Sequence, residues 1–257
     1  FFGPRGTTLD RLPVAVVPIA LDGAPSGDDA PDFAALYDEG GVAFVQLLLA
    51  QENGMFTRFG APRQIADHEI AAERGPADVC AGDFDGDAVP DLFVVNTGAT
   101  TAVHHVVLGQ ARPAPPLGAV HRFAAPAGSW LCRAADFDGD GLADVLVVPG
   151  AGAAPNQQPE VWLARPAAVG QPQFVQSALP VRAFPYEAVA IADLDGDGRQ
   201  DIALVSGSTL QLDVCHGLGD GSFEGGVPLD FTIDGYDADP ASPAVGLHAC
   251  RNGPQQS

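Results

Sequence analysis

Four aspartates lie within nine residues of the chain, in the stretch Asp136-Phe137-Asp138-Gly139-Asp140-Gly141-Leu142-Ala143-Asp144. They occupy positions 1, 3, 5 and 9 of a short loop that has glycine at positions 4 and 6. Clustered carboxylates suit a hard cation: Ca²⁺ takes about 6–8 oxygen ligands, whereas Mg²⁺ demands a near-ideal octahedron. We therefore expect a calcium ion held by the side chains of Asp136, Asp138, Asp140 and Asp144, the backbone carbonyl of Leu142, and water.

The same loop recurs once upstream and once downstream. The copies begin at Asp83 and Asp193, which lie 53 and 57 residues from Asp136. We expect three calcium sites in all. The two further ligand sets are Asp83, Asp85, Asp87 and Asp91 with the carbonyl of Val89, and Asp193, Asp195, Asp197 and Asp201 with the carbonyl of Arg199. Repetition at this period predicts stacked supersecondary units.

The residue at position 12 argues against a helix–loop–helix calcium site. That motif requires a glutamate there, and the three loops have Val94, Val147 and Leu204 instead. Each loop runs directly into a short apolar segment rich in β-branched residues, which is typical of a strand buried on both faces. We therefore expect the loops to join strand to strand.

Two stretches depart from the pattern. Ala88 stands at position 6 of its loop, where the other two have glycine. If this position needs a positive φ angle, alanine costs on the order of 1–2 kcal/mol, so we expect this site to be the weakest of the three. A degenerate loop between Asp22 and Asp32 has lost the spacing, and we expect it to bind calcium weakly or not at all.

The aspartate loop followed by an apolar strand, repeated at this period, resembles the FG-GAP/VCBS repeats of integrin-α-type β-propellers. A Gly-Asp-Gly-Ser-Phe turn, found here at 219–223, is a second feature of that family. The resemblance implies an all-β fold, namely a β-propeller built from four-stranded blades. It further implies that the metal loops stabilise one rim of the propeller while ligands bind elsewhere.

The chain divides into repeats at approximately 12–74, 75–127, 128–185 and 186–234, followed by a partial repeat at 240–257. We therefore expect a single β-propeller, or a propeller fragment, with about four complete blades and partial blades at both ends. Residues 1–11 resemble the tail of a repeat whose beginning is missing. Because the chain opens on Phe1 without a methionine, we expect a mature form or an excised fragment.

The formal net charge of the 257-residue chain is −21, and its 12 basic residues are all arginines, scattered singly. Phosphate contacts need clustered basic side chains, so we expect no nucleic-acid partner. No stretch reaches the roughly 18 apolar residues that a membrane helix needs, so we expect no membrane insertion. The resemblance implies an extracellular protein, either secreted or at the cell surface.

Four cysteines, Cys80, Cys132, Cys215 and Cys250, form no C-x-x-C pair, which argues against zinc and thioredoxin-like sites. Cys80 and Cys132 each lie shortly before an aspartate loop, in adjacent repeats. Adjacent propeller blades pack face to face, so an inter-blade disulfide between these two residues is one possibility. Buried free thiols are the other.

Groups that could perform catalysis are thinly spread. His104 and His105 are neighbours on an expected strand and so point to opposite faces. Trp130, Trp162 and Tyr186 could form a sugar-stacking platform but fit a core better. We expect a non-enzymatic module for extracellular recognition or adhesion, with a protein or glycan ligand. Two alternatives stay open: a carbohydrate-active propeller, either lectin-like or similar to polysaccharide lyases, and a spacer domain of a larger surface protein.

Overall fold

The computed structural model describes residues 9, 11–20, 32–51, 55–65, 73–98, 101–111, 116–126, 128–150, 157–181, 185–206, 211–225 and 229–230. Several sequence-based expectations lie outside these residues. They concern residues 1–8 and 10 of the partial repeat at 1–11, the partial repeat at 240–257, the degenerate loop at 22–31, Cys250 and the side chain of Trp130.

Four antiparallel sheets make up the described structure, and no helix lies in that part of the chain. Each sheet is a meander whose strands pair in chain order. The strands are β1 (Ala15–Ile19), β2 (Asp32–Asp38), β3 (Ala43–Ala50), β4 (Phe56–Gln64), β5 (Glu73–Gly82), β6 (Asp91–Gly98), β7 (Thr101–Gly109), β8 (Leu117–Pro126), β9 (Ser129–Ala135), β10 (Asp144–Pro149), β11 (Glu160–Ala164), β12 (Phe174–Ala178), β13 (Ala188–Ala192), β14 (Asp201–Ser206), β15 (Gln211–Gly217), β16 (Phe223–Gly225) and β17 (Leu229–Asp230). The expected all-β fold with four-stranded, propeller-type blades is confirmed.

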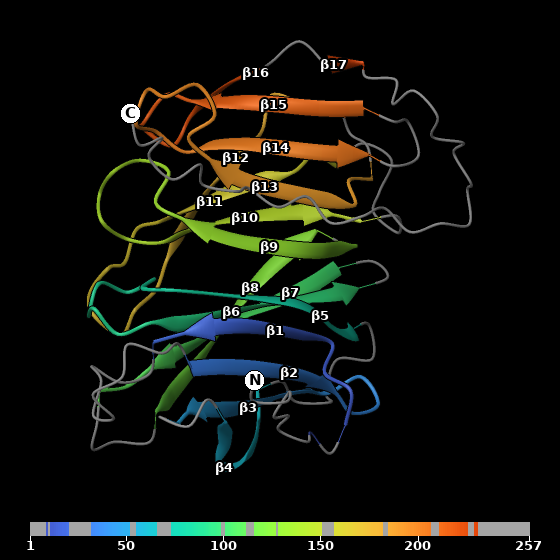
Figure 1. Ribbon diagram of the computed structural model, residues 1–257, viewed down its shortest axis with the longest axis vertical. Helices are drawn as coiled ribbons and strands as arrows, with labels where there is room; N and C mark the ends of the chain where they lie inside the picture. Colours follow the sequence, from blue (N-terminus) through green and yellow to red (C-terminus); the bar gives the residue numbers. More distant parts are fainter. Residues whose placement is uncertain are drawn as a thin grey trace, which may run out of the picture.

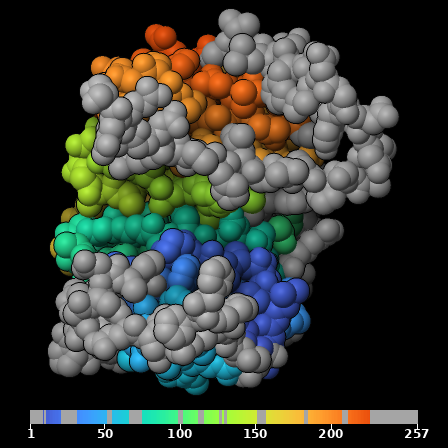
Figure 2. All heavy atoms as spheres, in the orientation of Figure 1, coloured from blue at the N-terminus to red at the C-terminus, as the bar shows by residue number. Residues whose placement is uncertain are grey.

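The sheets, called blades 1 to 4 from here on, follow one another in chain order along the long axis of the molecule (Figure 1). Blades 1, 2 and 3 hold β1–β4, β5–β8 and β9–β12, and blade 4 holds β13–β16 with β17 pairing beside β16 on the edge of β15. The coloured bands of the space-filling view run in the same order from blue to orange (Figure 2). First strands of neighbouring blades are in contact, β1 with β5 and β5 with β9.

Burial follows each strand's place in its blade. All six residues of β10 and seven of the eight in β6 are buried, because these second strands have a strand on each side and a blade packed against them. The fourth strands β4 and β12 are mostly exposed. Continuous apolar runs therefore mark the strands that are covered on both faces.

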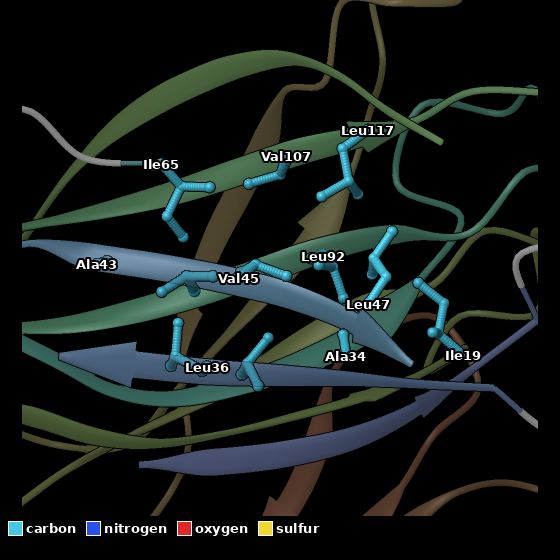
Figure 3. Packing of buried hydrophobic residues seen from close by; sticks show 12 residues of the cluster. Ile19, Ala34, Leu36, Ala43, Val45, Leu47, Ile65, Leu92, Val107 and Leu117 are labelled. Carbon is cyan, nitrogen blue, oxygen red and sulfur yellow. The ribbon is translucent and has the colours of Figure 1, made fainter. Parts of the chain in front are cut away.

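Hydrophobic side chains from facing blades form one core at each of the three blade interfaces. Figure 3 shows the core between blades 1 and 2, where Leu36 and Leu47 of blade 1 lie in one cluster with Leu92 and Val107 of blade 2. Every blade interface in the described structure is therefore held by burial of apolar surface, the dominant favourable contribution to folding.

The core between blades 2 and 3 is rich in aromatic rings. Phe93 packs edge to face against Trp162, with ring centroids 5.7 Å apart. Cys80 and Cys132 lie in this core, and Cys215 lies in the core between blades 3 and 4; all three are free and buried. Of the two possibilities left open by the sequence, the described residues thus show free thiols.

Polar contacts also join the blades. The guanidinium of Arg63 in blade 1 donates to the carbonyls of Leu117 and Gly118 in blade 2. The carboxylate of Asp78 in blade 2 accepts a hydrogen bond from the Arg133 side chain of blade 3 at 2.8 Å, and one from a backbone N–H of the same strand at 3.1 Å. These directional bonds fix how one blade sits on the next.

One buried histidine couples the fold to pH. His104 on β7 is fully buried beside Phe93 and Trp162, and its Nδ1 accepts the backbone N–H of Asn96 at 3.3 Å. Burial lowers the pKa of His104 from 6.5 to about 3, and the neighbouring His105 adds to the effect. The folded protein therefore keeps this imidazole neutral at pH values where the unfolded chain protonates it.

The substitution His104→Leu should remove this contribution. Below pH 6.5 the unfolded wild type binds one proton that the folded protein does not, so His104 lowers the free energy of unfolding by about 1.4 kcal/mol per pH unit. The free energies of unfolding of the variant and the wild type are measured with urea in the presence of chelator. As the pH falls from about 6.5 to 4.5, the value for the variant should rise relative to that for the wild type. A difference that stays constant over this range would contradict the assignment.

Candidate metal centres

The three aspartate loops connect the first and second strands of blades 2, 3 and 4, and they share one hydrogen-bond pattern. The aspartate at position 1 accepts the N–H of position 4 at 2.7 Å in every loop and the N–H of position 6 at 2.8–3.0 Å. The aspartates at positions 3 and 5 each accept the N–H two residues further along. The backbone is thus folded around its own carboxylates, as in Asx turns.

The aspartate at position 9 is buried in every loop, and in the blade-2 loop Asp85 at position 3 is buried as well. Asp91, Asp144 and Asp201 are at most 1% exposed. One carboxylate oxygen accepts the N–H of position 2 at 2.8–2.9 Å. The other accepts an N–H from the third strand of the same blade at 2.7–2.9 Å. This single carboxylate therefore fastens the loop to the sheet.

Blade 1 keeps the same attachment at the end of its degenerate loop. Asp32 is buried at the start of β2, and its Oδ1 accepts the N–H of Ala50 on the third strand at 2.8 Å. Ala50 thus holds the place of Gly109, Ala164 and Gly217 in the other blades. From the sequence we named Asp32 only as the end of the degenerate loop and predicted no anchoring role for it, although it shares with the other anchors its place directly before an apolar strand.

Carboxylates converge in every loop. The groups whose ligand atoms lie within 4.8 Å of one another are Asp83, Asp85 and Asp91; Asp136, Asp138 and Asp144; Asp193, Asp195 and Asp197; and Asp195, Asp201 and His216. Asp87 and Asp140, at position 5, lie outside these groups. Val89, Leu142 and Arg199, at position 7, each donate their N–H to the position-5 carboxylate. Apart from His216, the donors are hard oxygens, which fits Ca²⁺.

Burial makes the position-9 carboxylates of blades 2 and 3 hard to ionise. Burial raises the pKa of Asp91 to about 7, with a smaller contribution from Asp85 and Asp87, and two backbone N–H bonds oppose the shift. Burial likewise raises the pKa of Asp144 to about 6, against two similar N–H bonds. A cation among the carboxylates would favour their charged forms.

Ala88 adopts a φ angle of +64°, in the left-handed region. At the same loop position Gly141 and Gly198 have φ angles of +87° and +88°. Because the Cβ of an L-residue is strained there, the blade-2 loop carries a conformational cost that the other two avoid. Position 6 therefore has the positive φ angle on which the expectation of a weaker blade-2 site depends. That this site has the lowest calcium affinity of the three stays a prediction.

The blade-2 and blade-3 loops touch each other. The N–H of Ala143 donates to the carbonyl of Asp83 at 2.9 Å, and the N–H of Gly170, from the outer hairpin of blade 3, donates to the Asp85 carboxylate at 2.8 Å. Gly82 allows this approach, since a Cβ there would lie 2.3 Å from that of Ala143. The blade-2 loop is therefore in direct contact with two segments of blade 3.

Two further side chains reach the loops from the third strand or its end. Arg165 pairs with Asp138 and Asp140 of its own loop, and its hydrogen bond with Asp138 raises the pKa of Arg165. The Nδ1 of His216 lies 3.4 Å from the Asp195 carboxylate. Sequence reasoning missed both residues, because only the pairing of the second and third strands brings them next to the loop.

The aromatic and histidine candidates belong to the interior. Trp162 and Tyr186 are fully buried, and the Tyr186 hydroxyl donates to the Asp213 carboxylate. His104 and His105 are also buried, on β7. None of these four side chains offers a surface on which a sugar could stack.

Replacing Asp144 by Asn should destabilise the metal-free protein by about 1–3 kcal/mol. An amide accepts through its oxygen, but its NH₂ group would face the second backbone N–H donor. Asp140→Asn removes the same charge at a more exposed position and should cost under about 1 kcal/mol. Urea unfolding in the presence of chelator measures both variants, and equal losses would contradict the anchoring role of Asp144.

A family model described as an FG-GAP-like repeat matches residues 136–204. The matched stretch runs from the first aspartate of the blade-3 loop into the second strand of blade 4, so it spans one period of the fold. No curated protein matches the chain significantly. Within the described residues, no helix has the length and apolar character needed to cross a membrane. Residues 136–204 are therefore similar to an FG-GAP-like repeat, and the four four-stranded antiparallel sheets are consistent with a β-propeller.

Proposed function

We propose that this chain is a calcium-binding β-propeller module, secreted or at the cell surface, that recognises an extracellular protein or glycan and catalyses no reaction. The observation that carries the calcium part is the convergence of carboxylate oxygens within 4.8 Å in three loops that share one hydrogen-bond pattern. The FG-GAP-like repeat supports a scaffold role for these loops.

Calcium would act as a structural staple. The aspartates at positions 1, 3, 5 and 9 and the carbonyl at position 7 would hold the ion, and the ion supplies the positive charge that the crowded carboxylates need. Because the unfolded chain lacks the assembled loop, binding favours the folded state. At a free calcium concentration of about 100 Kd, each site adds roughly 2.7 kcal/mol.

A small cavity on blade 1 favours a glycan as the first ligand to test. Its volume is about 260 Å³, and the residues that line it are Arg11, Tyr37, Glu39, Gln46, Arg58 and Pro62. The Arg11 guanidinium is paired with the Glu39 carboxylate, so Arg58 is the lining residue that would pair with the carboxylate of an acidic sugar. This combination supports the lectin-like form of the proposal and points to acidic glycans.

Calcium should raise the Tm of the chelator-treated protein by at least about 5 °C at saturating concentration. Magnesium at the same concentration should do less, because it gives up its waters reluctantly. Asp138→Asn should reduce the calcium effect, whereas Asp220→Asn, an equal change of charge in an exposed turn outside the loops, should not. An identical Tm in calcium and in chelator would rule out a calcium staple.

Ala88→Gly should tighten calcium binding at the blade-2 loop, because glycine removes the cost of the positive φ angle, which is on the order of 1–2 kcal/mol. Gly141→Ala provides the matched reverse change in the blade-3 loop and should weaken binding there. Calcium titration calorimetry on both variants checks the pair. No change in affinity for either variant would mean that backbone strain does not set the ranking of the sites.

On a glycan array, the calcium-loaded protein should bind acidic glycans, and Arg58→Ala should lose that binding while keeping the wild-type Tm. Equal binding by the variant would place the ligand elsewhere on the molecule. The absence of any glycan signal from a folded, calcium-loaded protein would favour a protein ligand or the spacer role.

A further inference from the structure

Arg165 is held against the blade-3 loop by the same strand that anchors the loop. The N–H of Ala164 donates to Asp144 at 2.8 Å, so the next side chain emerges beside the carboxylates. Its Nη1 donates to Asp140 at 3.1 Å and to the Ala164 carbonyl at 2.6 Å, and its Nη2 pairs with Asp138. One guanidinium therefore engages two of the four side chains expected to bind calcium.

The equivalent residues of the other loop-bearing blades carry no charge. Gln110 and Leu218 occupy the same place, since each N–H, like that of Arg165, donates to the carbonyl of the residue directly before the fourth strand. The side chain of Gln110 lies against Gly118 in its own hairpin, and Leu218 is exposed. Among these three equivalent positions, only blade 3 sets a positive charge on its loop.

We propose that Arg165 is a built-in competitor of calcium at the blade-3 loop. The inference rests on the proposed function, in which Asp138 and Asp140 are ligands of the ion. In the metal-free protein the guanidinium offsets the repulsion between these carboxylates. When calcium binds, Arg165 either leaves them or stays beside a divalent ion of like charge, and both outcomes oppose binding.

Two properties follow from this arrangement. Arg165 stabilises the metal-free loop. Calcium binding at the blade-3 loop therefore raises the free energy of unfolding by less than it would if the loop held the carboxylates without Arg165. The Arg165 side chain is 41% exposed, so dissolved salt screens its interactions and the competition should weaken as the ionic strength rises.

The test is calcium titration calorimetry on the full chain, with Asp87→Asn and Asp197→Asn weakening the blade-2 and blade-4 loops. On this background Arg165→Gln, which copies Gln110, should tighten calcium binding at the blade-3 loop by about threefold to tenfold at low ionic strength. The gain should shrink in about 0.5 M salt. Arg165→Lys keeps the charge and should stay near the parent affinity. In chelator, Arg165→Gln should also have a lower Tm than the parent.

Unchanged or weaker calcium binding by Arg165→Gln, with the blade-3 loop still loading, would overturn the inference alone. Asp138→Asn on the same background shows whether that loop is the one titrated. If the parent takes up no calcium that Asp138→Asn removes, the proposed function fails and this inference fails with it. A gain of equal size at low and high salt would point to a steric role for Arg165 and would also overturn the competition.

Discussion

The hydrogen bonds accepted by the carboxylate at position 9 are the interaction on which the rest of each blade depends. This carboxylate lies in the interior, and its two oxygens accept N–H groups from two segments, the loop and the third strand, that would otherwise be joined only through the second strand. Blade 1 retains the interaction through Asp32 and Ala50. The hydrogen bond from this carboxylate to the third strand recurs in all four blades, which indicates that it is part of the blade framework. The surrounding carboxylates are features of the aspartate loops.

Burial at position 9 places a carboxylate, away from water, next to the other carboxylates of the loop. The carboxylates at positions 1 and 3 lie close to the anchor in blades 2 and 3, and the carboxylate at position 3 does so in blade 4. The backbone N–H groups around these carboxylates favour their charged forms and so oppose the effect of crowding. A different residue distinguishes the surroundings of the carboxylates in each of the three loops. Blade 2 has the strained Ala88, blade 3 sets Arg165 on its carboxylates, and blade 4 places His216 beside Asp195 and Asp201.

The stacking of blades explains other differences between equivalent positions. Phe84 and Phe137, at position 2 of their loops, are buried in the cores that blades 2 and 3 form with the following blade. Leu194 has the same position in blade 4 and is 48% exposed, since no further blade follows in the described part of the chain. The same residue position is therefore interior or surface according to what packs against the blade.

The features that the sequence predicted are local ones. The aspartate spacing predicted the loops, and the apolar runs beginning at Asp91, Asp144 and Asp201 predicted the second strands. The chirality of amino acids was enough to predict that Ala88 is strained if its position needs a positive φ angle. Contacts between distant segments were beyond prediction. Strand register brings Arg165 and His216 to their loops, and the stacking of blades joins Asp78 to Arg133. The thiol state of Cys80 and Cys132 was left open for the same reason, because it depends on how two blades meet.

The most direct test of the central claim, that the aspartate loops are calcium sites, is an anomalous difference map from crystals of the full chain grown in calcium. The account predicts one peak in each of the blade-2, blade-3 and blade-4 loops, surrounded by the side chains at positions 1, 3, 5 and 9 and the carbonyl at position 7. Loops that hold only water in such crystals, with the carboxylates hydrogen-bonded to the backbone alone, would contradict it.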